Sequence, residues 1–507
     1  MLTPEYLETM PDAMVALWQQ VEDDILLDIA RRIAQADEAD LLTPSAIWQA
    51  WRYEQTRAVQ QDVVNTLARY SGKNKDLIRQ LLLDAGLQTL AADDAQYRAA
   101  GLSPSDVQTN AALNNLLDAG YRQTLGTWQN LTATTAGTVA GAFAQRMDRA
   151  WLQVSSGAFD YNTAIKRAVD DLADQMPGVT YPSGHRDTLE VAARRAILTG
   201  VNQTAAKLQL ARAEEMGCEF VEVTAHEGAR PEHALWQGKV YHIGGAILYE
   251  GIWYEDFETA TGYGTGPGLC GWNCRHNFYP FFPGVSVRSY TQDKLDALNA
   301  REIGYNGRLY TWYEITQMQR ELERRVRKYK RRYLAEQAAG QDTTATAVRL
   351  RDARRALNDF IQATGGKVDG ARTSVTGFGY PEGRQTNKQV KVQNRLDAAN
   401  TDLNQLRQDG IIKSKGAMAL PPAAPDTLIF EREHVFQRIM ERQMKFTDAD
   451  RIITNARFAL RQQNGGLYAY YSDEGFVAVR SDGTIFSMGR LDEGGQKMME
   501  VARKYGF

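Results

Sequence analysis

Residues suited to metal chemistry gather in one stretch of the chain. Four of the six histidines and two of the three cysteines lie between residues 226 and 276. Thiolate sulfur and imidazole nitrogen are the usual ligands of a tetrahedral zinc ion, and C-x3-C spacing lies within the range that zinc sites use. We therefore expect a structural zinc ion here. The expected ligands are His233, Cys270 and Cys274, with His226 or His276 as the fourth.

Other interpretations of the same stretch stay open. Two loops joined by histidine hydrogen bonds, with buried free cysteines, would give the same pattern. A cysteine nucleophile needs a base and an orienting group, and Cys270 with His276 and Asn277 is the weaker arrangement that the sequence offers. The glycine string at 262–268 lacks the lysine of a P-loop, so we expect a flexible loop and not a phosphate cradle.

A second set of reactive residues lies near the C-terminus. His434, Arg438 and Arg442 are spaced four apart, and such residues drift by roughly 40° per step around a helix, so they share one face. A histidine can transfer a proton, and two guanidinium groups can bind a phosphate and stabilise its developing charge. With Ser487 on a facing strand, this set predicts RNA cleavage without a cofactor. The alternative is an exposed helix whose basic face is balanced by Glu431 and Glu441.

The patterning that must position these residues predicts a multidomain α+β protein. A chain of 507 residues is long enough for about three or four folded units. Helical spacing, strand-like alternation and turn signals divide it. We expect a largely α-helical region at 1–145, a mixed α+β core with the Cys/His motifs at 146–300, a basic helical extension with an extended loop at 301–412, a linker at 413–425, and a small α+β domain at 426–507.

Several elements are predicted with definite bounds. Residues 310–338 are dense in helix formers and predict a helix, whereas 218–223 alternate like a strand. Separate helices are expected to begin near Asn74 and Ser103, and residues 365–395 read as an extended loop. For the C-terminal domain we expect helices over 431–445 and 447–462, followed by strands at 467–471, 476–480 and 484–488 that are joined by turns.

Charge is distributed unevenly along the chain. The net charge is -7 over residues 1–150, -6 over 151–300, +10 over 301–416 and 0 over 417–507. The basic segment predicts a local contact with an anionic partner, for which DNA is one choice, or else a solvated helical face. Three cysteines are too few for a disulfide framework, which favours synthesis in a reducing cytoplasm. The sequence shows neither a secretory signal nor a membrane span, so we expect no membrane partner.

A resemblance to a known family rests on three segments. They are AARRAILTGVNQTAAKLQ at 192–209, AHEGARPEHALWQGK at 225–239 and TGYGTGPGLCGWNCRHNFYPFFPGVS at 261–286. Together with the opening LTPEYLETMPDAMVALWQQVEDD, they resemble the phage minor capsid protein 2 family, within the Mu F-like head-morphogenesis proteins. The resemblance covers roughly residues 1–410. It implies a low-copy virion protein of the phage head, with portal and capsid proteins as partners.

The C-terminal domain carries a second, shorter resemblance. A small α+β unit behind a Pro/Ala-rich linker resembles the effector end of phage-borne polymorphic toxins. The order of a His/Arg helix, a second helix and a hairpin-rich sheet is similar to the barnase/EndoU/colicin/RelE-like nuclease group. That resemblance implies a ribonuclease with RNA as substrate and an immunity protein as a further partner. The alternative is a purely structural virion protein whose last domain is a docking module without catalysis.

Overall fold

The chain folds into two compact units. The computed structural model describes residues 1–107, 109–176, 178–181, 185–425, 427–430, 433–442, 444–462, 466–480 and 482–507. The first unit comprises Met1–Glu382 and the second Gly383–Phe507. Helices dominate the first unit, and small antiparallel sheets occur in both, so the expected mixed α+β multidomain class is confirmed.

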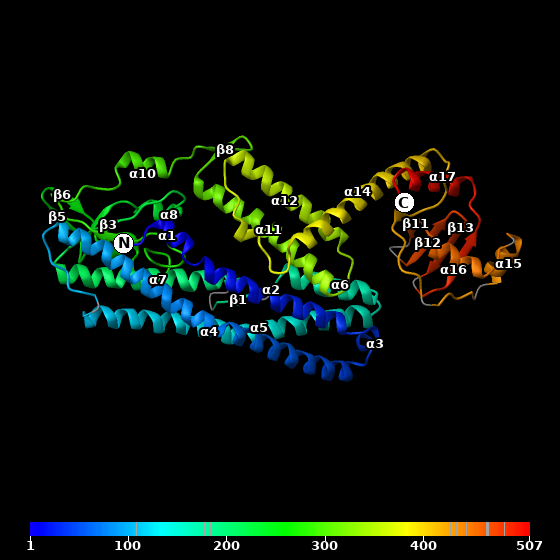
Figure 1. Ribbon diagram of the computed structural model, residues 1–507, viewed down its shortest axis with the longest axis horizontal. Coiled ribbons are helices and arrows are strands. Elements are labelled where there is room, and N and C mark those ends of the chain that lie inside the picture. Colours follow the sequence, from blue (N-terminus) through cyan, green and yellow to red (C-terminus); the bar gives the residue numbers. More distant parts are fainter. Residues whose placement is uncertain are drawn as a thin grey trace. The chain divides into compact units, whose positions relative to one another are not determined.

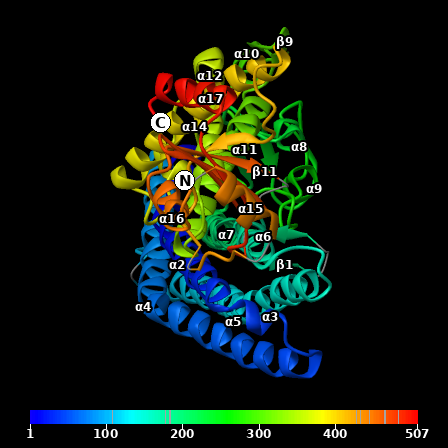
Figure 2. The same cartoon turned by 90° about the vertical axis from the view of Figure 1, so that its right-hand side faces the viewer.

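Long helices form the framework of the first unit. Figures 1 and 2 both show α4 and α5 side by side. Apolar side chains such as Trp18, Trp128 and Phe143 form their shared core with α2. The helices of this layer are α1 (Pro4–Thr9), α2 (Asp12–Gln35), α3 (Glu38–Leu41), α4 (Ser45–Ala99), α5 (Ala111–Ser155), α6 (Tyr161–Asp174) and α7 (Leu189–Met216).

Two of the predicted helix starts in this layer are wrong. Helix α4 runs through Asn74 without a break, because Asn74 is buried inside a continuous helical stripe. The following helix begins at Ala111 and not near Ser103. Its start is set by Asn110, whose side-chain oxygen accepts hydrogen bonds from the backbone N–H groups of Ala112 and Leu113.

A small sheet follows α7. Gly217 ends that helix in the left-handed conformation (φ 61°), which turns the chain into the predicted strand β3 (Phe220–Val223). Strand β3 pairs with β4 (Val240–His242) on one side and β7 (Phe278–Pro280) on the other. The remaining elements of this region are β1 (Val179–Thr180), β2 (Arg186–Asp187), α8 (Pro231–Ala234), β5 (Ile247–Tyr249), β6 (Ile252–Tyr254), α9 (Phe257–Thr261), α10 (Gln292–Leu298), β8 (Ile303–Tyr305) and β9 (Arg308–Tyr310).

Helix α11 (Trp312–Ala338) confirms the predicted basic helix. Thr311 and Glu314 form a capping box that fixes its first turn. It packs along α12 (Thr344–Thr364), near the short α13 (Gly370–Thr373), as Figure 1 shows. Several of its cationic side chains form ion pairs with carboxylates of α2, α6 and α7, so part of the positive charge of this helix is balanced within the chain.

Buried ion pairs connect α11 to α2. Nε of Arg331 donates to Asp23 at 2.7 Å, and its Nη2 donates to Glu22 at 2.5 Å. Arg331, Glu22 and Asp23 are all buried. Toward α6, Arg332 forms ion pairs with Asp170 and with Asp174. The contacts of Arg331 join residues 308 and 309 positions apart in sequence, and those of Arg332 join residues 162 and 158 positions apart.

The second unit is built on a five-stranded antiparallel sheet whose strands follow chain order. The strands are β10 (Ala417–Ala419), β11 (Phe458–Gln462), β12 (Leu467–Ser472), β13 (Gly475–Arg480) and β14 (Ile485–Gly489). The helices are α14 (Tyr380–Gln408, which begins at the end of the first unit), α15 (Glu433–Glu441), α16 (Thr447–Thr454) and α17 (Glu493–Lys504). The predicted strands at 467–471, 476–480 and 484–488 are confirmed as β12, β13 and β14.

Both faces of this sheet are covered. One core joins Ile439 of α15 and Ile452 of α16 to Val477 and Met488 of the sheet. The other joins Leu403 of α14 and residues of α17 to the opposite face. Successive side chains of a strand point to opposite faces, so neighbouring residues of β13 and β14 enter different cores.

Three predictions for this half of the chain are wrong. The expected linker at 413–425 contains β10, whose Met418 is buried against the sheet. The expected loop at 365–395 contains α13 and the first half of α14. The expected helix over 447–462 ends at Thr454, and Phe458 begins β11. In each case pairing or packing with distant residues overrides the local pattern, since β11 exists between β10 and β12.

Replacing Arg331 with alanine should destabilise the first unit strongly. The change leaves the Glu22 and Asp23 carboxylates buried without their cation, which costs roughly 3–5 kcal/mol in comparable sites. Chemical denaturation of the full chain, followed by tryptophan fluorescence, measures the loss. Arg355→Ala is the matched control, because the Arg355 side chain is 83% exposed, and it should cost under about 0.5 kcal/mol. Equal losses for the two variants would contradict the role assigned to the buried pairs.

Candidate metal centre

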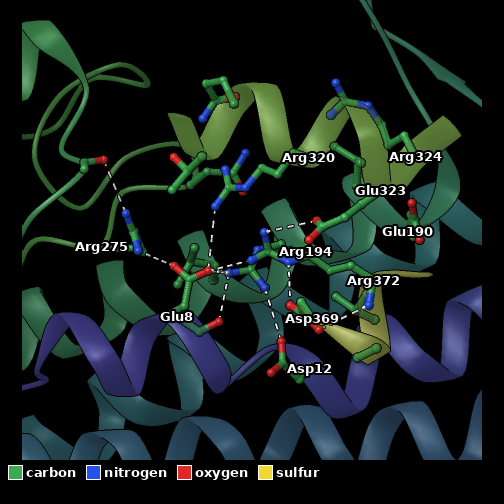
Figure 3. A pocket seen from close by; sticks show the side chains of 18 of the residues that line it. Glu8, Asp12, Glu190, Arg194, Arg275, Arg320, Glu323, Arg324, Asp369 and Arg372 are labelled. Carbon is green, nitrogen blue, oxygen red and sulfur yellow. Dashed lines mark hydrogen bonds and ion pairs between the residues drawn. The ribbon is translucent and has the colours of Figure 1, made fainter. Parts of the chain in front are cut away.

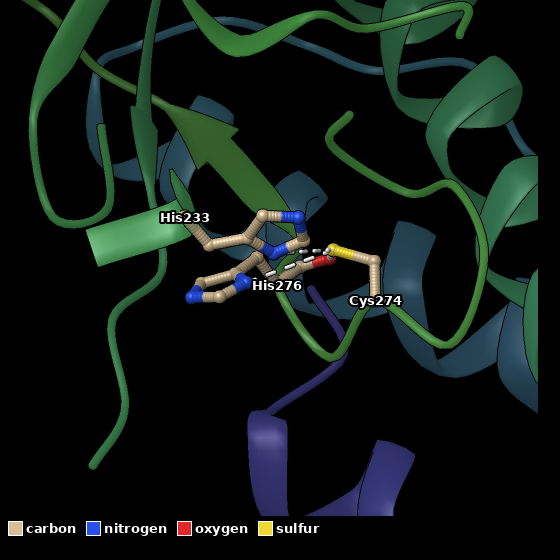
Figure 4. Close-up of side chains that lie close together, drawn as sticks. All are labelled: His233, Cys274 and His276. Atoms are coloured by element: carbon tan, nitrogen blue, oxygen red, sulfur yellow. Dashed lines mark hydrogen bonds between the residues drawn. The ribbon is translucent and has the colours of Figure 1, made fainter. Parts of the chain in front are cut away.

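Three ligand-type side chains meet in the core of the first unit. His233 lies in α8, and Cys274 and His276 lie in the loop that enters β7 (Figure 4). Sγ of Cys274 is 3.9 Å from Nδ1 of His233 and 3.6 Å from Nδ1 of His276. Tetrahedral zinc places sulfur and nitrogen ligands on the order of 3.5 Å apart. The three side chains are buried, and their ligand atoms lie within 4.8 Å of one another.

Hydrogen bonds hold both imidazoles in the form that binds metal. Nε2 of His233 lies 2.8 Å from the carbonyl oxygen of Pro267, which can only accept, so Nε2 carries the proton. Nε2 of His276 donates in the same way to Oε1 of Gln237 at 3.0 Å. Oε1 of Gln237 is assigned as the acceptor because it also accepts a hydrogen bond from the backbone N–H of His226. Both Nδ1 lone pairs therefore face the sulfur, as metal-binding histidines with an outer hydrogen bond do.

Burial sets the protonation of the group. It lowers the pKa of His233, and it lowers the pKa of His276 well below the ordinary value for histidine. Both rings are therefore neutral at physiological pH. Burial also raises the pKa of the Cys274 thiol to about 11. The sulfur would ionise near neutral pH only beside a cation, so metal binding would release a proton.

Helix α7 holds the loop that carries two of these side chains. The Nδ2 group of Asn202 donates to the carbonyl oxygens of Cys274 (3.1 Å) and His276 (2.9 Å). Asn202 is fully buried, and its own Oδ1 accepts a hydrogen bond from Asn277. Asn202 and Gln237 are not among the residues expected from the sequence. For Asn202, the available signal is an asparagine on the apolar face of the predicted helix at 188–216.

The group differs in part from the ligands expected from spacing. His233 and Cys274 are brought together, with His276, the alternative fourth ligand, beside them. His226 stacks on His276 with ring centroids 4.4 Å apart, but its Nδ1 is bonded to the Glu227 carbonyl. Cys270 has a left-handed backbone (φ 58°) and packs in the same apolar cluster as Cys274. Neither His226 nor Cys270 is among the three residues whose ligand atoms come together.

The structure gives little support to Cys270 as a nucleophile. Burial raises its pKa well above the ordinary value for a thiol, and the nearby Cys274 adds to the shift. A protonated thiol is a weak nucleophile. Asn277, the expected orienting group, instead donates to Asn202.

The glycine-rich segment is a tightly folded loop. A side chain at Gly268 would overlap the carbonyl oxygen of Gly262, and one at Gly271 would overlap that of Gly266. The backbone N–H of Trp272 donates to Gly266 across the loop. This close packing differs from the flexible loop expected from composition, and it presents the Pro267 carbonyl to His233.

The expected C-terminal site is described only in part. The side chains of His434 and Arg438 lie outside the part of the chain that the structure describes, although their backbone forms α15. Arg442 follows this helix, and its Nη1 donates to the carbonyl oxygen of Met488 at 2.6 Å. Ser487 pairs with Ala478, which belongs to the core beneath α14 and α17. Strand alternation thus places Ser487 toward this core, whereas the described apolar residue Ile439 of α15 packs on the other face.

Comparison with known proteins identifies the family. A family model for phage minor capsid protein 2 matches residues 2–362. The chain belongs to this family. The minor capsid match spans all of α1–α11 and most of α12, including the group of His233, Cys274 and His276. The expected resemblance of residues 1–410 to the minor capsid family is therefore confirmed as far as residue 362.

Two phage proteins are similar to this minor capsid protein. A structural protein of Lactococcus phage LL-H is 26% identical over 313 residues, which cover 59% of this chain and 80% of the relative. A structural protein of Lactococcus phage mv4 is 42% identical over 80 residues, which cover 16% of this chain and 55% of the relative. No solved structure matches. The protein is a virion component, and none of the helices in its described residues has the length and apolar character of a membrane span.

Purified full-length protein should contain near-stoichiometric zinc. Cys274→Ser and His276→Ala should each remove the metal and lower the unfolding temperature, because metal-binding free energy contributes to folding. Elemental analysis and thermal unfolding measure the two effects. Cys218→Ser is the matched control, since Cys218 is also buried but packs in a different cluster. The Cys270→Ser variant should retain the metal. Loss of zinc from this variant would favour the ligand set expected from spacing, which includes Cys270.

Proposed function

We propose that this minor capsid protein is a low-copy component of the phage head interior, next to the portal. Residues 1–382 hold it in the particle, and residues 383–507 are a module that they carry. The observation that supports this division is the family match, which ends at residue 362, inside the first unit. The second unit has its own sheet and its own two cores. The place beside the portal rests on the family resemblance.

Zinc is the ion that we assign to His233, Cys274 and His276. The support is the shape of the group: two Nδ1 lone pairs directed at one sulfur, with both outer nitrogens occupied by acceptors. A bound ion would tie α8 to the loop before β7. With three protein ligands, a water or another group would complete the tetrahedron.

For the module, the first candidate function is RNA cleavage. Helix α15 spans the positions of His434 and Arg438, so the two residues lie one helical turn apart. In this proposal His434 transfers the proton, and Arg438 and Arg442 bind the phosphate. The hydrogen bond to Met488 uses one of the five N–H donors of Arg442. An RNA-cleaving module would need an immunity protein in the producing cell.

The second candidate function is docking to another virion protein. Large apolar side chains on and after α15 are exposed: Phe436 (41%), Met440 (76%) and Phe446 (45%). The rings of Phe436 and Phe446 lie 5.5 Å apart, so they form one patch. Contiguous exposed apolar surface of this kind is typical of protein contacts.

Phage encoding a protein that stops after Glu382 should still incorporate it. All buried ion pairs between α11 and the acidic helices are kept in this truncation, so the first unit should fold without the module. Mass spectrometry of purified particles measures its amount relative to the full-length protein. A protein that stops after Ala300 is the matched control, because it lacks α11 and should not be incorporated. Exclusion of the longer truncation from particles would show that the module is needed for assembly.

Full-length protein should cleave RNA in the presence of a chelator. His434→Ala should slow cleavage by roughly 10²–10⁴-fold, the usual contribution of one positioned proton-transfer group. Arg442→Lys should restore little of the activity lost in Arg442→Ala, since a point charge cannot replace a bidentate fork. His185→Ala, a change in the first unit, is the control. Folded protein that leaves RNA intact, or cleaves it equally without His434, would favour docking.

A further inference from the structure

A strongly cationic cavity lies in the first unit. It has a volume of about 400 Å³ and opens where α1, α2, α7, α11 and α13 meet (Figure 3). Among the described residues that line it, there are seven arginines but only five carboxylates. The proposed metal ligands His233 and His276 form part of its wall. An excess of two positive charges in a partly enclosed space is costly without an anion.

One carboxylate stands among four of these arginines. Glu8, at the end of α1, accepts a hydrogen bond from Arg372 at 2.8 Å and pairs directly with Arg275. Arg320 and Arg194 approach it to 3.7 and 3.8 Å. Although burial alone would raise it, these four guanidinium groups hold the pKa of Glu8 at about 2. Arg194 and Arg372 have further carboxylate partners in Asp12 and Asp369. Among the described residues, Arg275 and Arg320 form ion pairs with Glu8 alone, so one negative charge serves two positive ones.

The arginines of α11 are the least compensated. Arg320 has Glu8 as its only ion-pair partner among the described residues, at 3.7 Å. Burial, together with the nearby Arg372, lowers the pKa of Arg320 to about 10. Arg324 lies one turn further along α11 (Figure 3), and within the described ranges no carboxylate forms an ion pair with it.

A buried arginine supplies a third observation. Arg327 is only 5% exposed and lines the cavity. Its Nη1 pairs with Glu190, but its Nε and Nη2 have no hydrogen-bond partner within the described part of the chain. Nη2 comes no closer than 3.7 Å to Glu22. Unsatisfied donors on a buried cation are unfavourable, so Arg327 adds poorly compensated positive charge to this wall of the cavity.

We propose that this cavity binds a phosphate group, either inorganic phosphate or the phosphate of a nucleotide. The excess of two positive charges matches a phosphate dianion, and guanidinium forks match its oxygens. About 400 Å³ lies within the range of small-molecule sites and admits a nucleotide but not a nucleic-acid duplex. The site is thus separate from the DNA contact expected for the basic segment, and it does not depend on the function proposed for the module.

Full-length protein, as purified and without added chelator, tests the inference, so that the cavity wall formed by His233 and His276 keeps whatever metal it holds. Sodium phosphate should raise the unfolding temperature above the value in sodium chloride at the same ionic strength, and the increase should be larger for the unchanged protein than for Arg320→Gln. The comparison with the variant removes the general stabilisation that phosphate gives to folded proteins. Calorimetric titrations with phosphate, AMP and ATP then measure affinity. Tighter binding of a nucleotide than of phosphate identifies a nucleotide site, and equal binding identifies a phosphate site.

Two variants and a control make the test specific. Arg320→Gln and Arg324→Gln should each weaken phosphate or nucleotide binding by roughly 10-fold or more, the usual effect of one charged hydrogen bond. Arg324 is exposed and is expected to tolerate the change without loss of folding. Arg355→Gln, an exposed arginine of α12, should leave binding unchanged. The absence of any stabilisation or binding by all three probes, or equal weakening by Arg355→Gln, would overturn the proposal.

Discussion

The first unit depends on the burial of arginine side chains from α11 against carboxylates of the N-terminal helices. Arg331 with Glu22 and Asp23 is the deepest of these contacts, and Arg327 with Glu190 extends them to α7. Because each partner alone would be an uncompensated buried charge, helix α11 has few places where it can pack. The uneven charge of the chain follows from this constraint: an acidic N-terminal half receives a basic helix that is encoded far downstream.

These ion pairs also explain why the charge pattern of the sequence alone could not identify the partners of the basic segment. The basic segment predicts an anionic partner, and the structure shows that carboxylates of the same chain balance part of its charge. Positive charge remains in excess in the cavity near Glu8, where the arginines that line it outnumber the carboxylates. The candidate metal centre shares a wall with this cavity. Charge, rather than apolar shape, therefore distinguishes this region from the helical core around Trp18 and Phe143.

The sequence was most informative where local interactions decide the structure. Helix α11 is predicted almost to the residue, because helix formers and the Thr311–Glu314 capping box act within one segment. Strand β11 was missed, since its residues become a strand only between β10 and β12. In the metal centre, composition indicated the right stretch, but spacing could not choose the ligands. Cys270 has a left-handed backbone, and no pattern in the sequence reveals that angle.

The bond from His233 to the Pro267 carbonyl has a consequence for mutational studies. The acceptor belongs to the main chain, so no amino-acid substitution can delete it while leaving the loop intact. Alanine substitutions across residues 262–272 would introduce steric overlap at glycines such as Gly268. They would not test which nitrogen of the His233 imidazole carries the proton. The tautomer of His233 is thereby encoded in the path of the backbone. Most single-residue substitutions would therefore leave this tautomer unchanged. Measurements that detect the proton itself, such as the nitrogen chemical shifts of the imidazole ring, are needed to observe it.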